Sequence, residues 1–270
     1  MDPGTVAQID VRLAQIQTEV EILLAIESGS RAWGFPSPDS DYDCRFIFLR
    51  AQEDYLSLYP KRDVIETPLE GALDVNGWDL AKSLKLLLKG NAVVIEWLTS
   101  PIVYMGHEWF RDAFRALAER WVDRDLVARH YLHLGERQRR AYFDDGKQFK
   151  LKKLFYALRP AAALRWLRLH PNEAVAPMHF PTLLAGCDVP TPVQVIVDEL
   201  IAMKAVTREL GTGELPAVLA QFIDAEFQVA ASRFDFSPHP VKPEAQRDAQ
   251  RFFLEVFARC DEFRPAISLR

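Results

Sequence analysis

Two segments are the most informative about the fold. They are Glu-Ser-Gly-Ser-Arg-Ala-Trp-Gly at residues 27–34 and Ser-Asp-Tyr-Asp-Cys-Arg-Phe-Ile-Phe-Leu at residues 40–49. The mostly apolar residues 20–26 precede them and predict a buried strand that runs directly into Gly29 and Ser30. Glycine lets the backbone approach an anion closely, and a serine hydroxyl and the free amides of a helix start can donate to phosphate oxygens. This segment therefore predicts a strand, a phosphate-binding turn and the start of a helix.

Asp41 and Asp43 stand two residues apart at the start of the next predicted strand. Alternate side chains of a strand share a face, so both carboxylates point into one small volume, away from Tyr42 and Cys44. Two unpaired anions this close raise each other's pKa unless a cation neutralises both. Mg²⁺, or Mn²⁺ in its place, suits this role because it takes oxygen ligands from a few carboxylates and from substrate phosphates. A Ser-Asp-x-Asp segment alone is equally typical of a surface turn, but the nearby Gly-Ser turn favours the metal site.

The combined pattern resembles a known superfamily. Gly-Ser-x-Ala-x-Gly at 29–34, then Ser-Asp-x-Asp at 40–43 and an apolar strand, is similar to the DNA polymerase β-like nucleotidyltransferases. The fuller sequence resembles the branch of predicted nucleotidyltransferases associated with RNA ligase. The segments that carry this second likeness are 27–35, 77–80, 91–101 and, more weakly, 152–160. The resemblance implies an α+β fold in which a mixed sheet with flanking helices is followed by an α-helical domain.

The resemblance also implies a mechanism and a third carboxylate. Asp41 and Asp43 would hold the metals of a two-metal site that releases pyrophosphate, and a later strand would supply another ligand. The candidates are Asp74 and Asp79, which strand alternation places on opposite faces. Asp79, just before a helix expected from Leu80, matches the family position. It is preferred as a metal ligand that places or deprotonates the acceptor hydroxyl, with Asp74 as the alternative.

Charge is distributed unevenly along the chain. The net charge is −5, yet residues 137–168 hold ten Lys or Arg against two Asp, a formal +8 that leaves −13 elsewhere. Lysine and arginine bind phosphate and tyrosine can stack on a base, so a helix here is expected to close over the triphosphate, with a solvated helix face as the alternative. Lys82, beside Asp79, is equally compatible with phosphate and with the surface. The residues expected to bind the donor nucleotide are Gly29, Ser30, Lys82, Lys152, Lys153, Tyr156 and Arg159.

Length and composition set the organisation. The 270 residues are 49% hydrophobic, enough for well-packed cores. We expect a nucleotidyltransferase catalytic domain over residues 1–110 and a helical domain over 111–270 that completes the cleft. Strands are expected near 63–67 and 73–78. Helices are expected at 8–17, 80–88, 92–98, 109–119, 123–142, 151–169, 193–210, 216–231 and 244–261.

The expected function is metal-dependent transfer of a nucleoside monophosphate, AMP from ATP by preference, to a hydroxyl. RNA in end processing or repair is the acceptor that the resemblance implies, while a small molecule or a protein hydroxyl stays open. The alternative class is a noncatalytic nucleotide-sensing or antitoxin-like module. No apolar run approaches the roughly 20 residues of a membrane span and no signal-peptide pattern is present, so we expect a soluble cytoplasmic protein. The three cysteines lack metal-site spacing and are expected to be reduced thiols.

Overall fold

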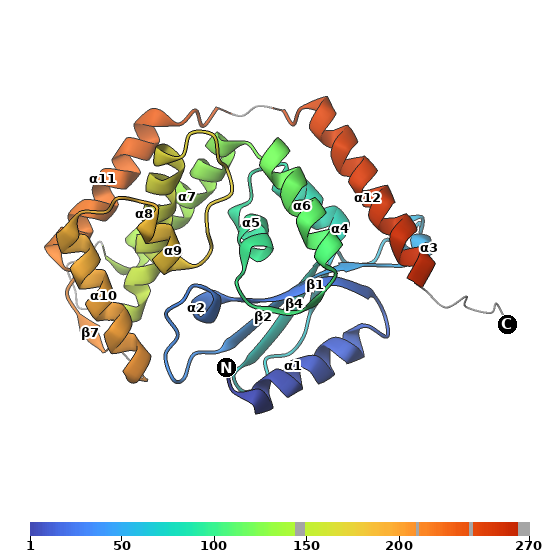
Figure 1. Ribbon diagram of the computed structural model, residues 1–270, viewed down its shortest axis with the longest axis horizontal. Helices are drawn as coiled ribbons and strands as arrows, with labels where there is room; N and C mark the ends of the chain where they lie inside the picture. Colours follow the sequence, from blue (N-terminus) through green and yellow to red (C-terminus); the bar gives the residue numbers. More distant parts are fainter. Residues whose placement is uncertain (144–148, 209–210, 238–239, 264–270) are drawn as a thin grey trace.

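A five-stranded mixed sheet lies at the centre of the computed structural model, which describes residues 1–143, 149–208, 211–237 and 240–263. The strand order is β3-β4-β2-β1-β5, with α1 on one face and further helices against the other face and beside it (Figure 1). This arrangement confirms the α+β class. The strands are β1 (Glu21–Ser28), β2 (Tyr42–Leu49), β3 (Val64–Glu66), β4 (Leu73–Asp79) and β5 (Val103–Gly106).

Helices make up most of the rest of the chain. They are α1 (Pro3–Ile16), α2 (Gly29–Ala32), α3 (Gln52–Tyr55), α4 (Leu80–Leu87), α5 (Ala92–Thr99), α6 (Glu108–Trp121), α7 (Arg124–Tyr142), α8 (Leu154–Leu169), α9 (Phe180–Ala185), α10 (Thr191–Val206), α11 (Ala217–Arg233) and α12 (Pro243–Phe263). A 3-10 turn, Leu151–Lys153, leads into α8, and two short strands, β6 (Phe149–Lys150) and β7 (Thr212–Gly213), pair with each other. Among the described helices, none is both long and apolar enough to cross a bilayer.

The predicted helices and strands are present with shifted ends. The N-terminal helix begins at Pro3, five residues before its predicted start, because Asp2 caps it by accepting a hydrogen bond from the Thr5 backbone N–H at 2.7 Å. Helix α9 was not predicted, and its six residues are too few to show helical periodicity.

Parallel pairing of β2 with β4 determines which polar residues meet. The register sets Asp43 opposite Asp74 and Phe48 opposite Asp79, while β1 runs antiparallel to β2 on its other side. Along β4 the side chains alternate between buried and half-buried, as expected for a strand with one more polar face. The two aspartates of β4 therefore lie at opposite ends of the strand.

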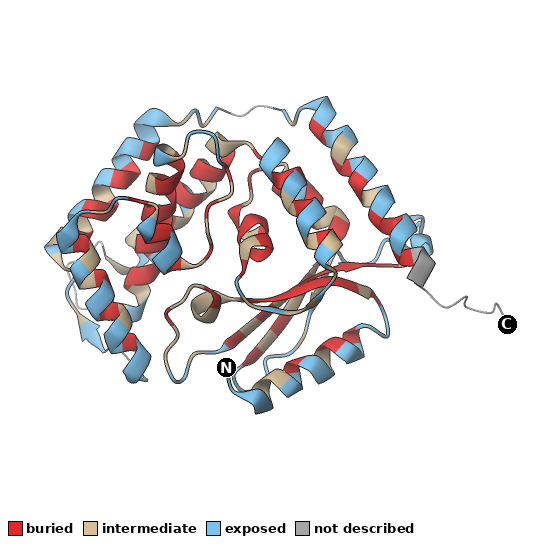
Figure 2. Ribbon diagram, in the orientation of Figure 1, coloured by how far each residue is buried: buried red, intermediate tan, exposed pale blue. Residues whose placement is uncertain are grey.

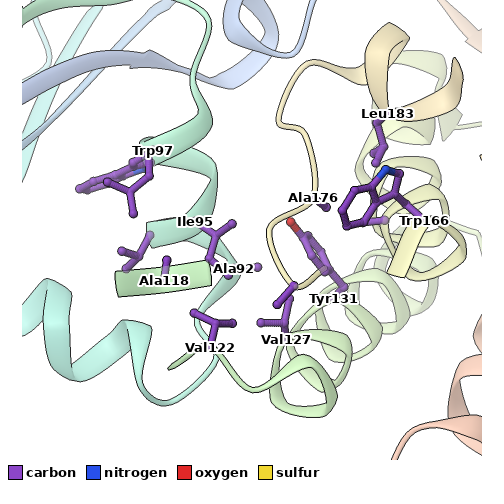
Figure 3. Close-up of a cluster of buried hydrophobic side chains, with 14 of the residues drawn as sticks. Ala92, Ile95, Trp97, Ala118, Val122, Val127, Tyr131, Trp166, Ala176 and Leu183 are labelled. Carbon is purple, nitrogen blue, oxygen red and sulfur yellow. The ribbon is translucent and has the colours of Figure 1, made fainter. Parts of the chain in front are cut away.

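Two hydrophobic cores lie on the two faces of the sheet. The smaller packs α1, through Ile9 and Leu13, against apolar residues of β2 and β4. The larger runs without interruption from the other face through α5 to the helices beyond, and Figure 3 shows Ile95 of α5 with Tyr131 of α7 and Trp166 of α8 in that cluster. Figure 2 shows the same division, with buried residues on the strands and on the helix faces turned inward.

The predicted boundary at residue 110 falls inside α6. This helix and α12 both pack beside the sheet, where they contact α5 and α4. The division into two domains stays a prediction, and the larger core joins the two parts.

Candidate active site

The Gly-Ser turn and the Asp-x-Asp pair meet where β1 ends and β2 begins. Gly29 has a φ of +66°, and a Cβ atom at this position would lie 2.0 Å from Oδ2 of Asp43. Any other residue would clash with the carboxylate and strain the backbone. Only glycine therefore allows the turn to approach Asp43 this closely.

Hydrogen bonds from α2 hold the loop that leads into β2. The Arg31 guanidinium donates from Nη2 to the Ser40 carbonyl at 2.7 Å and from Nε to the Asp41 carbonyl at 3.2 Å. The Ser30 hydroxyl donates to the Ser40 hydroxyl at 3.0 Å, and the Ser37 backbone N–H also donates to it at 2.8 Å. The loop therefore presents serine hydroxyls beside the carboxylates in a fixed arrangement.

Asp41 and Asp43 form an acidic wall. Asp41 is exposed at the start of β2, and Asp43 is half-buried on the same side. Burial raises the pKa of Asp43 above its ordinary value; the Arg45 charge opposes this shift, and the charges of Asp74 and Asp41 add to it. A cation bound here would reduce the electrostatic repulsion between the neighbouring carboxylates.

Asp74, not Asp79, is the β4 carboxylate beside Asp43. The Arg45 Nη2 atom lies 2.6 Å from Oδ2 of Asp74 and 3.2 Å from Oδ1 of Asp43, so one guanidinium joins them. Strand alternation could have indicated Arg45, because positions 41, 43 and 45 share one face. The partner strand could not be read from this pattern.

Asp79 is a correction to the sequence prediction. It lies five residues further along β4, about 16 Å from the Asp74 position. Its carboxylate accepts hydrogen bonds from the Ala81 backbone N–H and from the Tyr55 hydroxyl, both at 2.8 Å, and is buried. Asp79 therefore caps α4, and the structure does not bring it to the acidic wall.

Glu27 lies behind the acidic wall. It is fully buried, and its Oε1 atom accepts a hydrogen bond from the Asp43 backbone N–H at 3.0 Å while Oε2 accepts one from Tyr104. Burial raises the pKa of Glu27 to about 7, although these two hydrogen bonds lower it. This buried carboxylate therefore fixes the backbone of Asp43.

A cavity of about 420 Å³ opens in front of this wall. Lys152 and Lys153, in the 3-10 turn before α8, line this cavity together with Tyr156 of α8 and Lys204 of α10. The Lys153 ammonium lies 5.0 Å from the ring centre of Tyr156, within the range of a cation–π contact. With Arg45 and Asp39, the lining of this cavity holds four cationic and three carboxylate side chains.

Lys204 is a lining residue that the sequence did not reveal. It is 6% exposed, and its Nζ atom donates to the Phe35 carbonyl at 2.8 Å, which ties α10 to the loop before β2. Burial lowers the pKa of Lys204 to about 8, and the Asp39 charge opposes that shift. No local pattern in α10 distinguishes this lysine from a surface lysine.

Two residues expected to bind the nucleotide lie elsewhere. Lys82 is near Asp79, where its Nζ atom pairs with Asp63 at 3.0 Å. Arg159 is buried, donates to Glu96 at 2.7 Å and lies over the ring of Trp33 at 3.9 Å. Both side chains have partners that only the fold supplies, and neither lines the cavity, so their contact with the nucleotide stays a prediction. Arg159 packs against the ring of Trp33, and Trp33 lines the cavity.

Four arginines of the basic segment 137–168 form described ion pairs within the protein. Its described ion pairs are Arg139 with Asp224, Arg159 with Glu96, and both Arg165 and Arg168 with Glu226. Residues 144–148, which include Asp144, Asp145 and Lys147, lie outside the described residues. Lys152 and Lys153 are the members of the segment that line the cavity. The described part of the segment therefore does not form one continuous anion-binding face.

The acidic wall fits a hard divalent ion. Among the residues that the structure describes, no three His, Cys, Asp or Glu side chains are grouped to hold a metal without help. Asp41 and Asp43 nevertheless direct two carboxylates to one cavity, beside a glycine with no side chain to obstruct it. Mg²⁺ and Mn²⁺ commonly complete such a set with water and substrate phosphates.

The sequence resemblance indicated the DNA polymerase β-like nucleotidyltransferases. A family model is more specific: residues 6–255 match the RNA repair pathway DNA polymerase beta family, and the chain belongs to that family. The protein YcgL of Bacillus subtilis (strain 168) is 38% identical over 209 residues, which cover 77% of this chain and 79% of YcgL. A nucleotidyltransferase-like protein from Exiguobacterium sibiricum 255-15 is 10% identical, with a TM-score of 0.30 over 94% of this chain and 80% of that one, too distant to inform the site.

Proposed function

We propose that the chain is a metal-dependent nucleotidyltransferase that moves AMP from ATP to a hydroxyl acceptor. The observation that carries this proposal is one cavity lined by side chains of both charges. Asp41 and Asp43 line it together with Lys152, Lys153 and Lys204. A nucleoside triphosphate with its metal ion needs both kinds of group, because carboxylates hold the ion and ammonium groups pair with phosphates.

Asp41 and Asp43 are the proposed ligands of Mg²⁺ or Mn²⁺. When bound, the ion supplies charge stabilisation at the α-phosphate and the leaving pyrophosphate. The acceptor oxygen forms a bond to the α-phosphorus, the bond to the α,β-bridging oxygen breaks, and the hydroxyl proton passes to solvent. Gly29 lets the backbone and the polyphosphate come close, and the backbone N–H of Ser30 is the proposed donor to a phosphate oxygen.

The lysines and aromatic rings that line the cavity are the proposed binding site for the rest of the donor. Lys152, Lys153 and Lys204 balance the polyphosphate charge. Tyr156 is 36% exposed and meets Trp33 edge to face, with ring centres 6.0 Å apart. An exposed ring beside phosphate-binding lysines suits stacking with a nucleobase, which tolerates different bases.

RNA is the acceptor class that we propose. The family is one of RNA repair, and transfer to a hydroxyl suits the end of a strand. The internal ion pairs of the segment 137–168 argue against a long RNA-binding face, so we expect contact limited to the terminal nucleotides. Transfer to a small-molecule or protein hydroxyl would be detected in the same experiment.

The test is incubation with α-labelled ATP, CTP, GTP or UTP, with Mg²⁺ or Mn²⁺, and with RNAs of defined ends. We expect label on RNA and one pyrophosphate per transfer, most strongly with ATP. Label on protein or on a small molecule from a cell extract would change the acceptor. Nucleotide binding without label transfer or pyrophosphate under any condition would indicate the noncatalytic sensing module.

A further inference from the structure

The guanidinium of Arg45 lies between Asp43 and Asp74. Its Nη2 atom is 3.2 Å from Oδ1 of Asp43 and 2.6 Å from Oδ2 of Asp74. A cation shared by these two carboxylates would have to lie where this group lies. The protein itself therefore supplies the positive charge between its second and third carboxylates.

The sheet register builds this arrangement. Asp43 is opposite Asp74 and Arg45 is opposite Asn76 on the parallel strands β2 and β4. The four side chains form a block on one face, because residues two apart on a strand point the same way. The Asn76 amide donates to Oδ1 of Asp74, so each oxygen of that carboxylate already accepts a hydrogen bond.

Backbone contacts fix the guanidinium in place. Its Nη1 atom donates to the Cys44 carbonyl at 3.0 Å and to the Asp74 carbonyl at 2.9 Å. The Arg45 side chain is 19% exposed and lines the cavity, whereas Asp74 is not among the lining residues. Of this ion pair, Arg45 and not Asp74 therefore lines the cavity.

We propose that Arg45 is a built-in cation that takes the place of a second metal ion, so that the site binds a single divalent ion on Asp41 and Asp43. This inference rests on the proposed function and differs from the two-metal expectation. A dication and a guanidinium compete for the same carboxylate oxygens and repel each other. Arginine stays charged at any physiological pH, so loss of a proton does not vacate the position.

The first test counts bound ions. The wild-type protein is saturated with α,β-methylene-ATP and titrated with Mn²⁺, and bound ions are measured by equilibrium dialysis and electron paramagnetic resonance. We expect one Mn²⁺ per chain in the nucleotide complex. Two bound ions with the spin coupling of a pair about 3.5–4 Å apart would overturn the proposal.

Matched variants separate the roles of the carboxylates. Asp74→Asn should keep the single ion with a dissociation constant within about threefold of wild type, because Asp74 is not a ligand in this scheme. Asp41→Asn should weaken Mn²⁺ binding by about a hundredfold, because a ligand is lost. Equal losses in the two variants would contradict the proposal.

Removal of the guanidinium should create the second ion site. Arg45→Met keeps much of the aliphatic stem and should raise the count from one Mn²⁺ to two, whereas Arg45→Lys keeps a charge and should remain at one. A count of one in a folded Arg45→Met protein, judged by its melting curve, would oppose the proposal. If this variant does not fold, the wild-type count and Asp74→Asn decide.

Different results would contradict the role of Arg45 and the proposed nucleotidyltransferase function. Two ions in the wild-type complex remove the role of Arg45 and leave a nucleotidyltransferase intact. A wild-type protein that binds neither the nucleotide analogue nor Mn²⁺ removes the proposed function, and the Arg45 inference with it.

Discussion

The two ends of β4 carry the same residue type and use it differently. At one end Asp74 is 29% exposed and pairs with Arg45 beside a charged cavity. At the other end Asp79 is 4% exposed and satisfies the first turn of α4 and the Tyr55 hydroxyl. Asp79 is therefore structural, whereas Asp74 is joined through Arg45 to Asp43, a carboxylate that lines the cavity.

Lys204 and Lys82 also differ in their surroundings. Lys204 is buried at the cavity, where its ammonium has the Phe35 carbonyl as an acceptor and faces the space proposed for phosphate. Lys82 is partly exposed and pairs with Asp63 near the opposite end of β4. Surface pairs of this kind contribute little to stability, while a buried ammonium needs a compensating charge.

Loss of a proposed metal ligand should have the strongest effect on activity. Asp41→Asn should lower the transfer rate by about a thousandfold, because it removes a metal ligand and several kcal/mol of charge stabilisation. Asp41 is exposed, so the melting temperature should stay the same. The matched control is Asp79→Asn, which keeps a capping side chain and should transfer at the wild-type rate. An equally large loss of transfer rate in Asp79→Asn would show that Asp79 belongs to the active site.

An intermediate effect is expected at the lysines that line the cavity. Lys204→Met should raise the KM for ATP about 10- to 100-fold with a smaller change in kcat, because a charge-assisted hydrogen bond to phosphate is lost. Lys82→Met is the control and should leave KM unchanged. A KM for Lys204→Met equal to that of the control would exclude Lys204 from donor binding.

Lys204 also predicts a pH dependence. Its pKa is lowered to about 8, and only the protonated amine attracts phosphate. As pH rises through 8 the ammonium loses its proton, so kcat/KM for ATP should fall above that pH in the wild type. Lys204→Met should lack this component of the profile between pH 7 and about 9. Identical profiles for the two proteins would assign the titration to another group.

The smallest effect on activity is expected at the helix cap. Asp79→Ala should lower the free energy of unfolding by about 1–2 kcal/mol, because the Ala81 N–H and the Tyr55 hydroxyl lose their acceptor. Urea unfolding measures this change. Transfer activity per folded molecule should be unaffected, and a loss of activity without a loss of stability would contradict the assignment.

The fold class followed from the family resemblance, and the Gly-Ser turn and the Asp41–Asp43 pair could be recognised from the sequence directly. These are local features, because a strand's alternation and a glycine's conformational freedom act over a few residues. The helices after residue 110 followed in the same way from their periodicity. The short α9 did not, because six residues are too few to establish a period.

The groups that lie beside Asp41 and Asp43 could be identified only from the tertiary structure. Parallel pairing of β2 with β4 set Asp74 and not Asp79 beside Asp43, and placed Arg45 between the two carboxylates. Packing of α10 against the loop before β2 brought Lys204 to the cavity, 169 residues from its acceptor Phe35. The physical reason is that register and helix packing depend on the whole buried surface, so contacts between distant residues cannot be inferred from the pattern around either one.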